Sequence, residues 1–368
     1  MIAQNTGVRV LFTGQYWPGA NSMYIARSFE RCGAIVQILN ETAIFPSWQS
    51  ITARIVRKLL RPLIEMEFNR QLLDLATSFA PDLIYITNAD YCLPSTIQEL
   101  KRRGFPMMCF YHDVQWKDRA GSRFSQNIAE FDLIVTTRRW QEAEFKAAGA
   151  KAVSVVRFGF DPQVHHPIHL LQSAKVRYGS DVVFIGTCEN QRAQDLNDLL
   201  STSPSYSMRV WGNLWERLPA NAPVRRYWQG RSVDEQEVTA IYSASGIALH
   251  WVGWEPFGTN EMLKKGDQHN SRTFQIAACG GAVMLAQRTQ EHADFFIEDK
   301  EALFFNDLDE LKYKLNKWLD PRYKKARQRM AYLARLRCLR DNYTYDPVVH
   351  SFLRYFGLSS KFKAKGLL

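Results

Sequence analysis

HNSRTFQIAACGGAVMLAQRTQEH, residues 269–292, predicts a polar turn, a short helix, a double glycine, a buried strand and a second polar turn. Asn270 or Ser271 can cap the start of the helix, and Gly280 with Gly281 can end it. A helix that leads through glycine into an apolar strand is typical of an α/β protein with parallel strands.

The start of this predicted helix is suited to an anion. Its first backbone N–H groups lack partners and carry a partial positive charge, which favours phosphate. Arg272 and Gln275 lie one helical turn apart, so they share a face on which they could bind an anion and a sugar hydroxyl. The alternative, from this segment alone, is a buried helix–strand unit of any α/β protein.

The first half of the chain alternates short apolar strands with amphipathic helices. We expect strands at 8–13, 35–39, 82–87, 106–112, 132–137 and 152–159, and helices at 22–31, 95–103 and 139–148. This alternation predicts parallel strands joined by helical crossovers.

The same alternation returns in the second half. We expect strands at 181–186, 207–212, 225–230, 246–251, 282–286 and 303–307, and helices at 193–200, 234–244, 308–319, 321–340 and 347–357 besides the helix described first. The predicted organisation is an N-terminal Rossmann-like domain over 1–165, a linker over 166–179, a C-terminal Rossmann-like domain over 180–345, and a helix with a basic tail over 346–368. Two doubly wound parallel-sheet domains would face a cleft, with ligands beyond the carboxyl ends of the strands.

Composition narrows the class of protein. With 368 residues, 46% hydrophobic and 23% charged, the chain fits two globular domains and not a disordered protein. It offers neither a signal peptide nor the ~20 apolar residues of a membrane span, so we expect a cytoplasmic protein. Its six cysteines form no C-x-x-C pair, which argues against a zinc site or a disulfide framework.

The net charge of +10 points to an anionic partner, which could be a nucleotide, a lipid headgroup or nucleic acid. Dispersed basic residues without a recognition motif argue against nucleic acid.

The first predicted strand runs into GQYWPG, residues 14–19. This turn lacks the Lys and Ser or Thr of a P-loop and the spacing of a dinucleotide-binding loop, which disfavours kinase-type ATP binding and NAD chemistry. Gly14, Gln15 and Tyr16 could approach an acceptor or a leaving phosphate, and the alternative is a plain structural turn.

His112 and Asp113 follow another predicted strand, in FYHDV. Loops at strand ends carry catalytic residues on a rigid sheet. Asp113 could serve as a general base, and His112 could bind a sugar hydroxyl or steady its developing charge. A structural histidine is the alternative.

In the second half, FIGTCENQR places Arg192 at the start of a helix. Its guanidinium could bind a diphosphate and neutralise a leaving group. The alternative is an exposed arginine at a helix start.

Two other segments attract attention. Three histidines, His165, His166 and His169, lie in or next to the predicted linker without a helix or a carboxylate ligand, so we do not expect a metal.

A predicted helix over residues 51–68, ITARIVRKLLRPLIEMEF, alternates basic residues (Arg54, Arg57, Lys58 and Arg61) with apolar ones, as a helix on an anionic membrane does. The favoured alternative is a core-packed helix with a solvated face, which Pro62 would kink or end.

The run SRTFQIAACGGAVMLAQRTQEHADFFIEDKEALFFNDLDEL, followed by a basic helix and NYTYDP, resembles the C-terminal half of CgeB-type proteins, named for a spore-maturation protein. These look like glycosyltransferases of the GT-B architecture, related to the retaining family-four enzymes. The resemblance is dense over residues 182–345 and rests on general pattern before them, chiefly FTGQYWPG, FYHDV and FDLIVTT.

The resemblance implies that the first half accepts the sugar and the second binds a nucleotide-sugar donor. Arg192 and Arg272 would meet the diphosphate, the turn from Gly230 to Ser232 would lie near the base, and His112 would lie near the donor sugar. The expected donor contacts are Arg192, Gly230, Ser232, His269, Asn270, Ser271, Arg272, Thr273 and Gln275.

One position departs from the pattern that the resemblance implies. Gln275 falls where the family usually has a glutamate that holds the ribose, and Asp267 falls at the first glutamate of that pair. Glutamine can still bind a hydroxyl, so ribose binding can survive.

The sequence therefore predicts a metal-independent, retaining glycosyltransferase without a cofactor, whose acceptor is a glycan, a lipid-linked molecule or a small molecule. It is expected in the cytoplasm, with peripheral contact to the inner face of an anionic membrane as a further possibility. The alternatives are a catalytically weak nucleotide-sugar-binding protein and an inverting enzyme with Asp113 as base.

Overall fold

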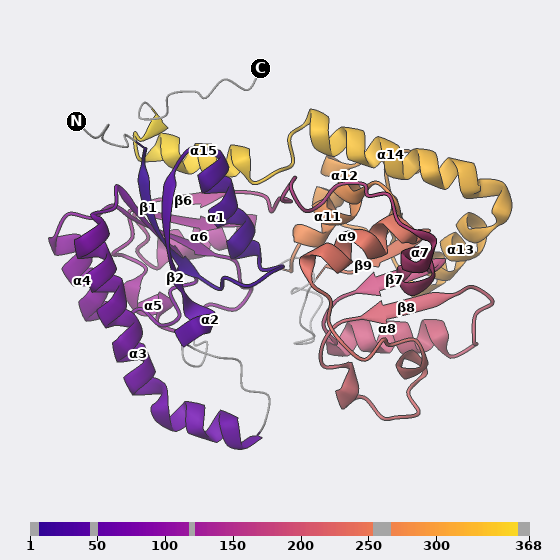
Figure 1. Ribbon diagram of the computed structural model, residues 1–368, viewed down its shortest axis with the longest axis horizontal. Coiled ribbons are helices and arrows are strands. Elements are labelled where there is room, and N and C mark those ends of the chain that lie inside the picture. Colours follow the sequence, from indigo (N-terminus) through magenta and orange to yellow (C-terminus); the bar gives the residue numbers. More distant parts are fainter. Residues whose placement is uncertain (1–6, 45–50, 118–121, 253–265, 360–368) are drawn as a thin grey trace. The chain divides into compact units, whose positions relative to one another are not determined.

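The computed structural model describes residues 7–44, 51–117, 122–252 and 266–359, without the side chains of 51–58 (Figure 1). The chain forms two compact units. The first comprises residues up to Arg157 together with those from Tyr345 onward, and the second comprises Phe158–Thr344.

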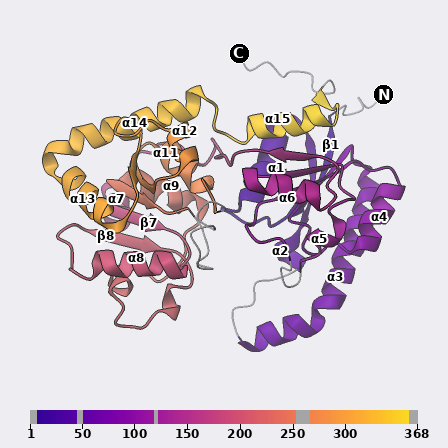
Figure 2. The ribbon, with the colours of Figure 1, turned by 180° about the vertical axis from the view of Figure 1, so that it is seen from behind.

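The first unit contains one sheet of six parallel strands in the order β2-β1-β3-β4-β5-β6. The strands are β1 Arg9–Gly14, β2 Ile35–Asn40, β3 Leu83–Thr87, β4 Met107–Tyr111, β5 Leu133–Thr136 and β6 Val153–Val155. The helices are α1 Asn21–Arg31, α2 Glu41–Ile44, α3 Ile51–Phe79, α4 Pro94–Arg102, α5 Phe124–Asn127, α6 Arg139–Ala147 and α15 Asp346–Tyr355. Figures 1 and 2 show α15 beside α1, so the end of the chain packs against its beginning.

The second unit contains a sheet of five parallel strands in the order β11-β10-β9-β7-β8. The strands are β7 Val182–Ile185, β8 Met208–Trp211, β9 Ile247–His250, β10 Val283–Gln287 and β11 Leu303–Phe305. The helices are α7 Gln172–Tyr178, α8 Asn190–Leu200, α9 Glu235–Ala244, α11 Ser271–Cys279, α12 Gln290–Phe295, α13 Leu308–Leu319 and α14 Lys324–Arg340, with 3-10 turns η1 Trp215–Arg217, η2 Pro223–Arg226 and η3 Pro321–Tyr323.

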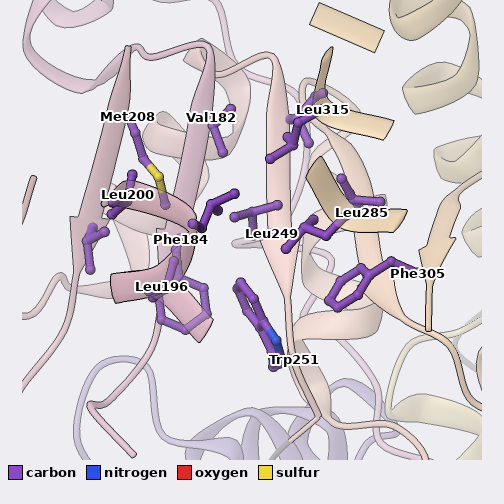
Figure 3. Packing of buried hydrophobic residues seen from close by; sticks show 14 of the residues in the cluster. Val182, Phe184, Leu196, Leu200, Met208, Leu249, Trp251, Leu285, Phe305 and Leu315 are labelled. Carbon is purple, nitrogen blue, oxygen red and sulfur yellow. The ribbon is translucent and has the colours of Figure 1, made fainter. Parts of the chain in front are cut away.

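Apolar side chains of both sheets form the cores that the alternation predicted. In the second unit, Phe184 and Leu249 from neighbouring strands meet Leu196 of α8 and Leu315 of α13 (Figure 3). Strands buried on both faces explain why β7 reads as the continuous apolar run VVFI. The prediction of two Rossmann-like parallel-sheet domains, the GT-B fold class, is confirmed.

Local predictions differ from the structure at several places. Residues 225–230 are not a strand of the sheet, because Pro223 begins the 3-10 turn η2 and only Trp228 bridges to Val210 of β8. The predicted linker contains α7, and α12 was not anticipated. Pro62 does not end α3, which continues from Ile51 to Phe79.

The boundaries of the compact units also differ from the domain limits expected from sequence, since the first unit breaks at Arg157 and takes up α15. Among the described residues, no helix is both long and apolar enough to cross a membrane.

Candidate functional site

The start of α11 is held by a complete capping box. Asn270 accepts a hydrogen bond from the Arg272 backbone N–H at 2.9 Å, and the Asn270 N–H donates to the Thr273 hydroxyl at 3.3 Å. This identifies Asn270, of the two predicted candidates, as the N-cap. The helix therefore begins at a fixed point, with its positive end defined.

The double glycine after α11 has two separate roles. Gly280 ends the helix in the left-handed region, with φ +64°. Gly281 has no room for a side chain, because a Cβ there would lie 2.5 Å from the Tyr242 carbonyl oxygen of α9. One glycine turns the chain and the other allows α9 to approach.

Arg272 and Gln275 share a face of α11, as their spacing predicted, and they bind each other. Arg272 Nη1 donates to Gln275 Oε1 at 2.8 Å. The Gln275 side chain is only 2% exposed, whereas Arg272 is half-buried. The amide NH2 of Gln275 keeps its donor capacity, and the guanidinium keeps further N–H groups for an anion.

Arg192 is a buried cation and not the exposed arginine of the alternative interpretation. It lies in the first turn of α8, 8% exposed, where Nη1 donates to the Thr187 carbonyl oxygen at 2.9 Å and lies 3.2 Å from Glu189 Oε1. Its Nε, also buried, has no hydrogen-bond partner among the described residues. Burial lowers the pKa of the guanidinium, and the charges of Glu189 and Asp267 oppose that shift. A buried cation with a spare donor favours a site for an anion.

A chain of hydrogen bonds joins β9, α11 and α12 behind this helix start. His292 Nδ1 lies 2.8 Å from the Gln287 carbonyl oxygen, and the Thr273 hydroxyl lies 3.0 Å from both His292 Nε2 and His250 Nε2. All three side chains are 3% exposed or less. Burial lowers the pKa of His292 to about 4 and holds that of His250 well below its usual value, so both rings are neutral at pH 7.

These bonds fix the tautomers of both rings. A carbonyl oxygen only accepts, so His292 carries its proton on Nδ1, and its Nε2 accepts from the Thr273 hydroxyl. The single hydroxyl proton is then used, so His250 must donate from Nε2 and keep the lone pair on Nδ1. No hydrogen bond to Nδ1 is found among the described residues. His250 was missed from the sequence, although its place at the end of the strand predicted at 246–251 was a usable signal.

His269 is also held by the protein on both sides. Its Nε2 accepts from the Phe158 backbone N–H at 3.0 Å, and Nδ1 lies 2.5 Å from Glu291 Oε2. A ligand contact through either nitrogen would displace one of these bonds. The arrangement anchors the residue that precedes Asn270, and Glu291 was not anticipated.

The turn that carries Gly230 and Ser232 follows η2. Gly230 has φ +79°, and both residues are exposed. Between them Arg231 pairs with Glu237 of α9 at 2.5 Å and lies over the Trp211 ring at the end of β8, 5.2 Å from its centroid. The turn is therefore fixed at the carboxyl edge of the second sheet.

His112 and Asp113 belong to the first unit, after β4. Asn88, which follows β3 with φ +56°, binds both: Nδ2 donates to Asp113 Oδ2 at 2.9 Å, and Oδ1 accepts from the His112 N–H at 3.1 Å. Arg138 donates to the His112 carbonyl oxygen at 2.8 Å. The pair thus lies at the strand end as predicted, where residues that follow β3 and β5 hold it. These supporting residues, Asn88 and Arg138, were not predicted from the sequence.

The turn after β1 is similarly ordered. A Cβ on Gly14 would lie 2.5 Å from Thr87 Oγ1, so a larger residue at this strand end would require Thr87 to shift. The Tyr16 N–H donates to Asn40 Oδ1 at 3.1 Å, and Gln15 is exposed. Gln15 also accepts from the Ser22 hydroxyl through its carbonyl oxygen.

The histidines of the predicted linker do not form a cluster. His165 is buried, with Nδ1 3.1 Å from the Asp161 carbonyl oxygen, whereas His166 and His169 are not buried. Over the described ranges, no group of three His, Cys, Asp or Glu side chains could hold a metal ion.

The family comparison matches mainly residues of the second unit. Residues 192–354 match the family model described as glycosyl transferase-like. This span contains Arg192, α11 and the histidine chain. No curated protein matches the chain.

Solved structures resemble the chain over nearly its whole length. Sucrose-phosphate synthase from Thermosynechococcus elongatus is 12% identical with a TM-score of 0.65, over 96% of this chain and 100% of that one. The Anabaena protein HepE, in complex with UDP-glucose, is 15% identical with a TM-score of 0.62, over 94% and 99%. Trehalose 6-phosphate synthase from Burkholderia multivorans is 13% identical with a TM-score of 0.59, over 96% and 99%. At these identities the likeness shows the shared two-domain fold.

Proposed function

We propose that this chain is a glycosyltransferase that moves a sugar from a nucleoside-diphosphate sugar to an acceptor hydroxyl. The observation that carries the proposal is the capped start of α11, with Arg272 and Gln275 on one face. The same unit holds the buried Arg192, whose Nε has no hydrogen-bond partner among the described residues. Both cations, and the helix start, suit a diphosphate. The match of residues 192–354 to a glycosyl transferase-like model supports the same conclusion.

In this proposal the reaction retains configuration and needs no metal. The bond between the anomeric carbon and the diphosphate oxygen breaks, the acceptor oxygen bonds to that carbon from the same face, and the acceptor proton passes to the departing diphosphate. Arg192, Arg272 and the start of α11 neutralise the charge that develops on the leaving group. A dedicated base is not required, and His112 contributes a contact to the sugar.

The remaining donor contacts are proposals of the same kind. Gln275 binds a ribose hydroxyl, and Gly230 with Ser232 lies near the base. Ser271, Thr273 and His269 shape the start of α11, and His250 adds a neutral acceptor on Nδ1 for a ligand hydroxyl. The acceptor, approached by Gly14, Gln15 and Tyr16, is a glycan, a lipid-linked molecule or a small molecule. In this proposal the enzyme acts in the cytoplasm and has no nucleic-acid partner.

The test is incubation with UDP-, GDP-, ADP- and CDP-sugars in the presence of EDTA, with released nucleotide as the readout. Release with one donor is expected. Neither release nor binding with any donor would overturn the proposal. NMR assignment of the product anomer then tests retention.

Two alternatives rest on particular residues. Gln275 in place of a carboxylate favours a weak binding protein, and a large gain in turnover for Gln275→Glu would support it. Asp113, accepting from Asn88 at 2.9 Å at the end of β4, favours an inverting enzyme with this carboxylate as base. An inverted product that disappears in Asp113→Asn would support that alternative.

A further inference from the structure

The helix α14 presents apolar side chains on two opposite faces. One face packs against α11 and β10 and buries Met330 and Cys338, which are 3% and 0% exposed. On the other face, Tyr332, Leu336 and Leu339 are 57%, 41% and 50% exposed. A surface helix ordinarily turns polar residues away from the core, so the second apolar face is not explained by the packing of this unit.

The exposed apolar residues of α14 are in line with two cations. Leu336 and Leu339 follow Tyr332 by four and seven positions, and Arg329 and Lys325 precede it by three and seven, so all five share one face of the helix. Both cations are exposed. We call these five residues the α14 face. At a rise of about 1.5 Å per residue, it is about 20 Å long. Figures 1 and 2 show α14 at the edge of its unit.

The cations of the α14 face differ from other arginines of the same helix. Arg335 donates to the Ala278 carbonyl oxygen at 2.6 Å, and Arg337 donates to that of Phe295 at 3.0 Å, so both stabilise the packing of α14. Over the described part of the chain, the side chains of Lys325 and Arg329 form neither an ion pair nor a hydrogen bond. Their charges are therefore available to a partner.

No carboxylate lies along this stretch of the chain to neutralise these charges. Residues 321–340 contain eight basic residues and no Asp or Glu. The partner of the α14 face must therefore supply negative charge at one end of the face and an apolar environment at the other.

This combination selects one kind of partner. A nucleic acid would bind the cations but leave Leu336 and Leu339 in water. A second copy of this chain would bury Lys325 and Arg329 without a counter-charge if the two α14 helices met, because α14 carries no carboxylate. An anionic lipid surface pairs its phosphates with the cations and takes up the leucines, while the Tyr332 hydroxyl stays among the headgroups.

We infer that the α14 face binds the surface of an anionic membrane, with α14 lying in the plane of the interface. The inference stands apart from glycosyl transfer, because it uses no residue of the candidate donor site.

The test is co-sedimentation of the whole chain with vesicles of phosphatidylcholine alone or with an equal amount of phosphatidylglycerol. Leu336→Gln/Leu339→Gln removes the apolar part of the face, and Lys325→Gln/Arg329→Gln removes its charge. Lys175→Gln/Arg226→Gln is the matched control, since it removes two exposed cations of the same unit from α7 and η2. Thermal unfolding and nucleotide release should be the same in all four proteins, because no substituted side chain is buried.

We expect the wild type and the control to bind vesicles that contain phosphatidylglycerol, and each α14 variant to bind them about tenfold or more weakly. Added salt should weaken the binding of the wild type. Control-like binding by either α14 variant would overturn the inference. Equal binding of the wild type to both kinds of vesicle, or to neither, would also overturn it. A wild-type dimer in sedimentation velocity that becomes a monomer in Leu336→Gln/Leu339→Gln would assign the face to a second copy instead.

Discussion

The guanidinium of Arg272 donates to the side-chain amide oxygen of Gln275 across one turn of α11, at 2.8 Å. This bond uses the acceptor of the amide and leaves its NH2 group to donate. A carboxylate at the same place could only accept. Gln275 is therefore suited to a ligand oxygen as acceptor, for instance the lone pair of a ribose hydroxyl.

Replacing Gln275 with methionine tests this role. Met keeps the volume and removes the amide, so binding of the preferred nucleoside diphosphate should weaken by about tenfold, the worth of one hydrogen bond. Titration calorimetry with the ribonucleotide and its 2′,3′-dideoxy form gives the measurement. The variant and the wild type should bind the dideoxy form equally, and a tenfold difference there would exclude a ribose contact.

Arg192→Met should weaken nucleoside diphosphate binding by about 30-fold, because a charge-assisted hydrogen bond is worth roughly 2 kcal/mol. Binding of the corresponding nucleoside should not change. Thermal stability should be retained, since methionine fills the buried position without placing a charge there. Arg329→Met, at an exposed position of α14, is the control, and equal losses in both variants would refute a specific role.

Thr273→Val should destabilise the second unit by about 2–4 kcal/mol, because it leaves two buried imidazole nitrogens without partners. Thr273→Ser keeps the hydroxyl and should cost much less. Urea unfolding compares the two, with pulse-labelled hydrogen exchange of β9 and β10 peptides reporting the second unit. Equal losses for Val and Ser would show that the methyl group, and not the hydroxyl, matters.

The second unit should lose stability as the pH falls. Burial lowers the pKa of His292 to about 4, so the unfolded chain binds a proton that the folded chain does not. Between the usual histidine pKa of about 6.5 and the folded value, the loss is about 1.4 kcal/mol per pH unit for this ring. Burial of His250 acts in the same direction. Urea unfolding from pH 7 to 4.5 should show this slope, and His292→Gln should flatten it.

The first unit should carry an opposite dependence through Glu41. Burial, reinforced by the charge of Asp90, raises the pKa of this carboxyl to about 8. The folded chain holds a proton that the unfolded chain releases, so stability falls as pH rises from about 4.5 toward 8. Glu41→Gln cannot ionise, and it should be several kcal/mol more stable than wild type at pH 9 yet similar at pH 5. The same difference at both values would contradict this.

The strands were largely predictable because apolar runs such as VVFI and LIYIT need a sheet buried on both faces. The segment 225–230 failed because Tyr227 and Trp228 have the composition of a strand, whereas Pro223 sets the backbone into a 3-10 turn. Composition describes only neighbouring residues, whereas the bridge between Trp228 and Val210 joins two separate segments of the chain.

For the candidate site, the spacing of residues along one helix could be read from the sequence, whereas their burial could not. The spacing placed Arg272 and Gln275 on one face of α11, but the hydrogen bond between them depends on their side-chain rotamers. The chain from His250 through Thr273 to His292 joins residues far apart in sequence, so only the sheet order β10-β9 brings them together. The burial of Glu65 on α3 could not be predicted from the sequence, because its partner Arg123 comes from a distant segment.

The bond between Asp346 and Arg31, 2.8 Å long, ties α15 to α1 within the first unit. During synthesis, residues 158–344 leave the ribosome before α15 does, so the second unit can fold while the first still lacks a helix. The first unit then has an uncovered face at α1 for as long as the second takes to emerge. A chain cut before Tyr345 would keep every residue of the second unit, but its first unit would lack α15 and leave the α1 face open.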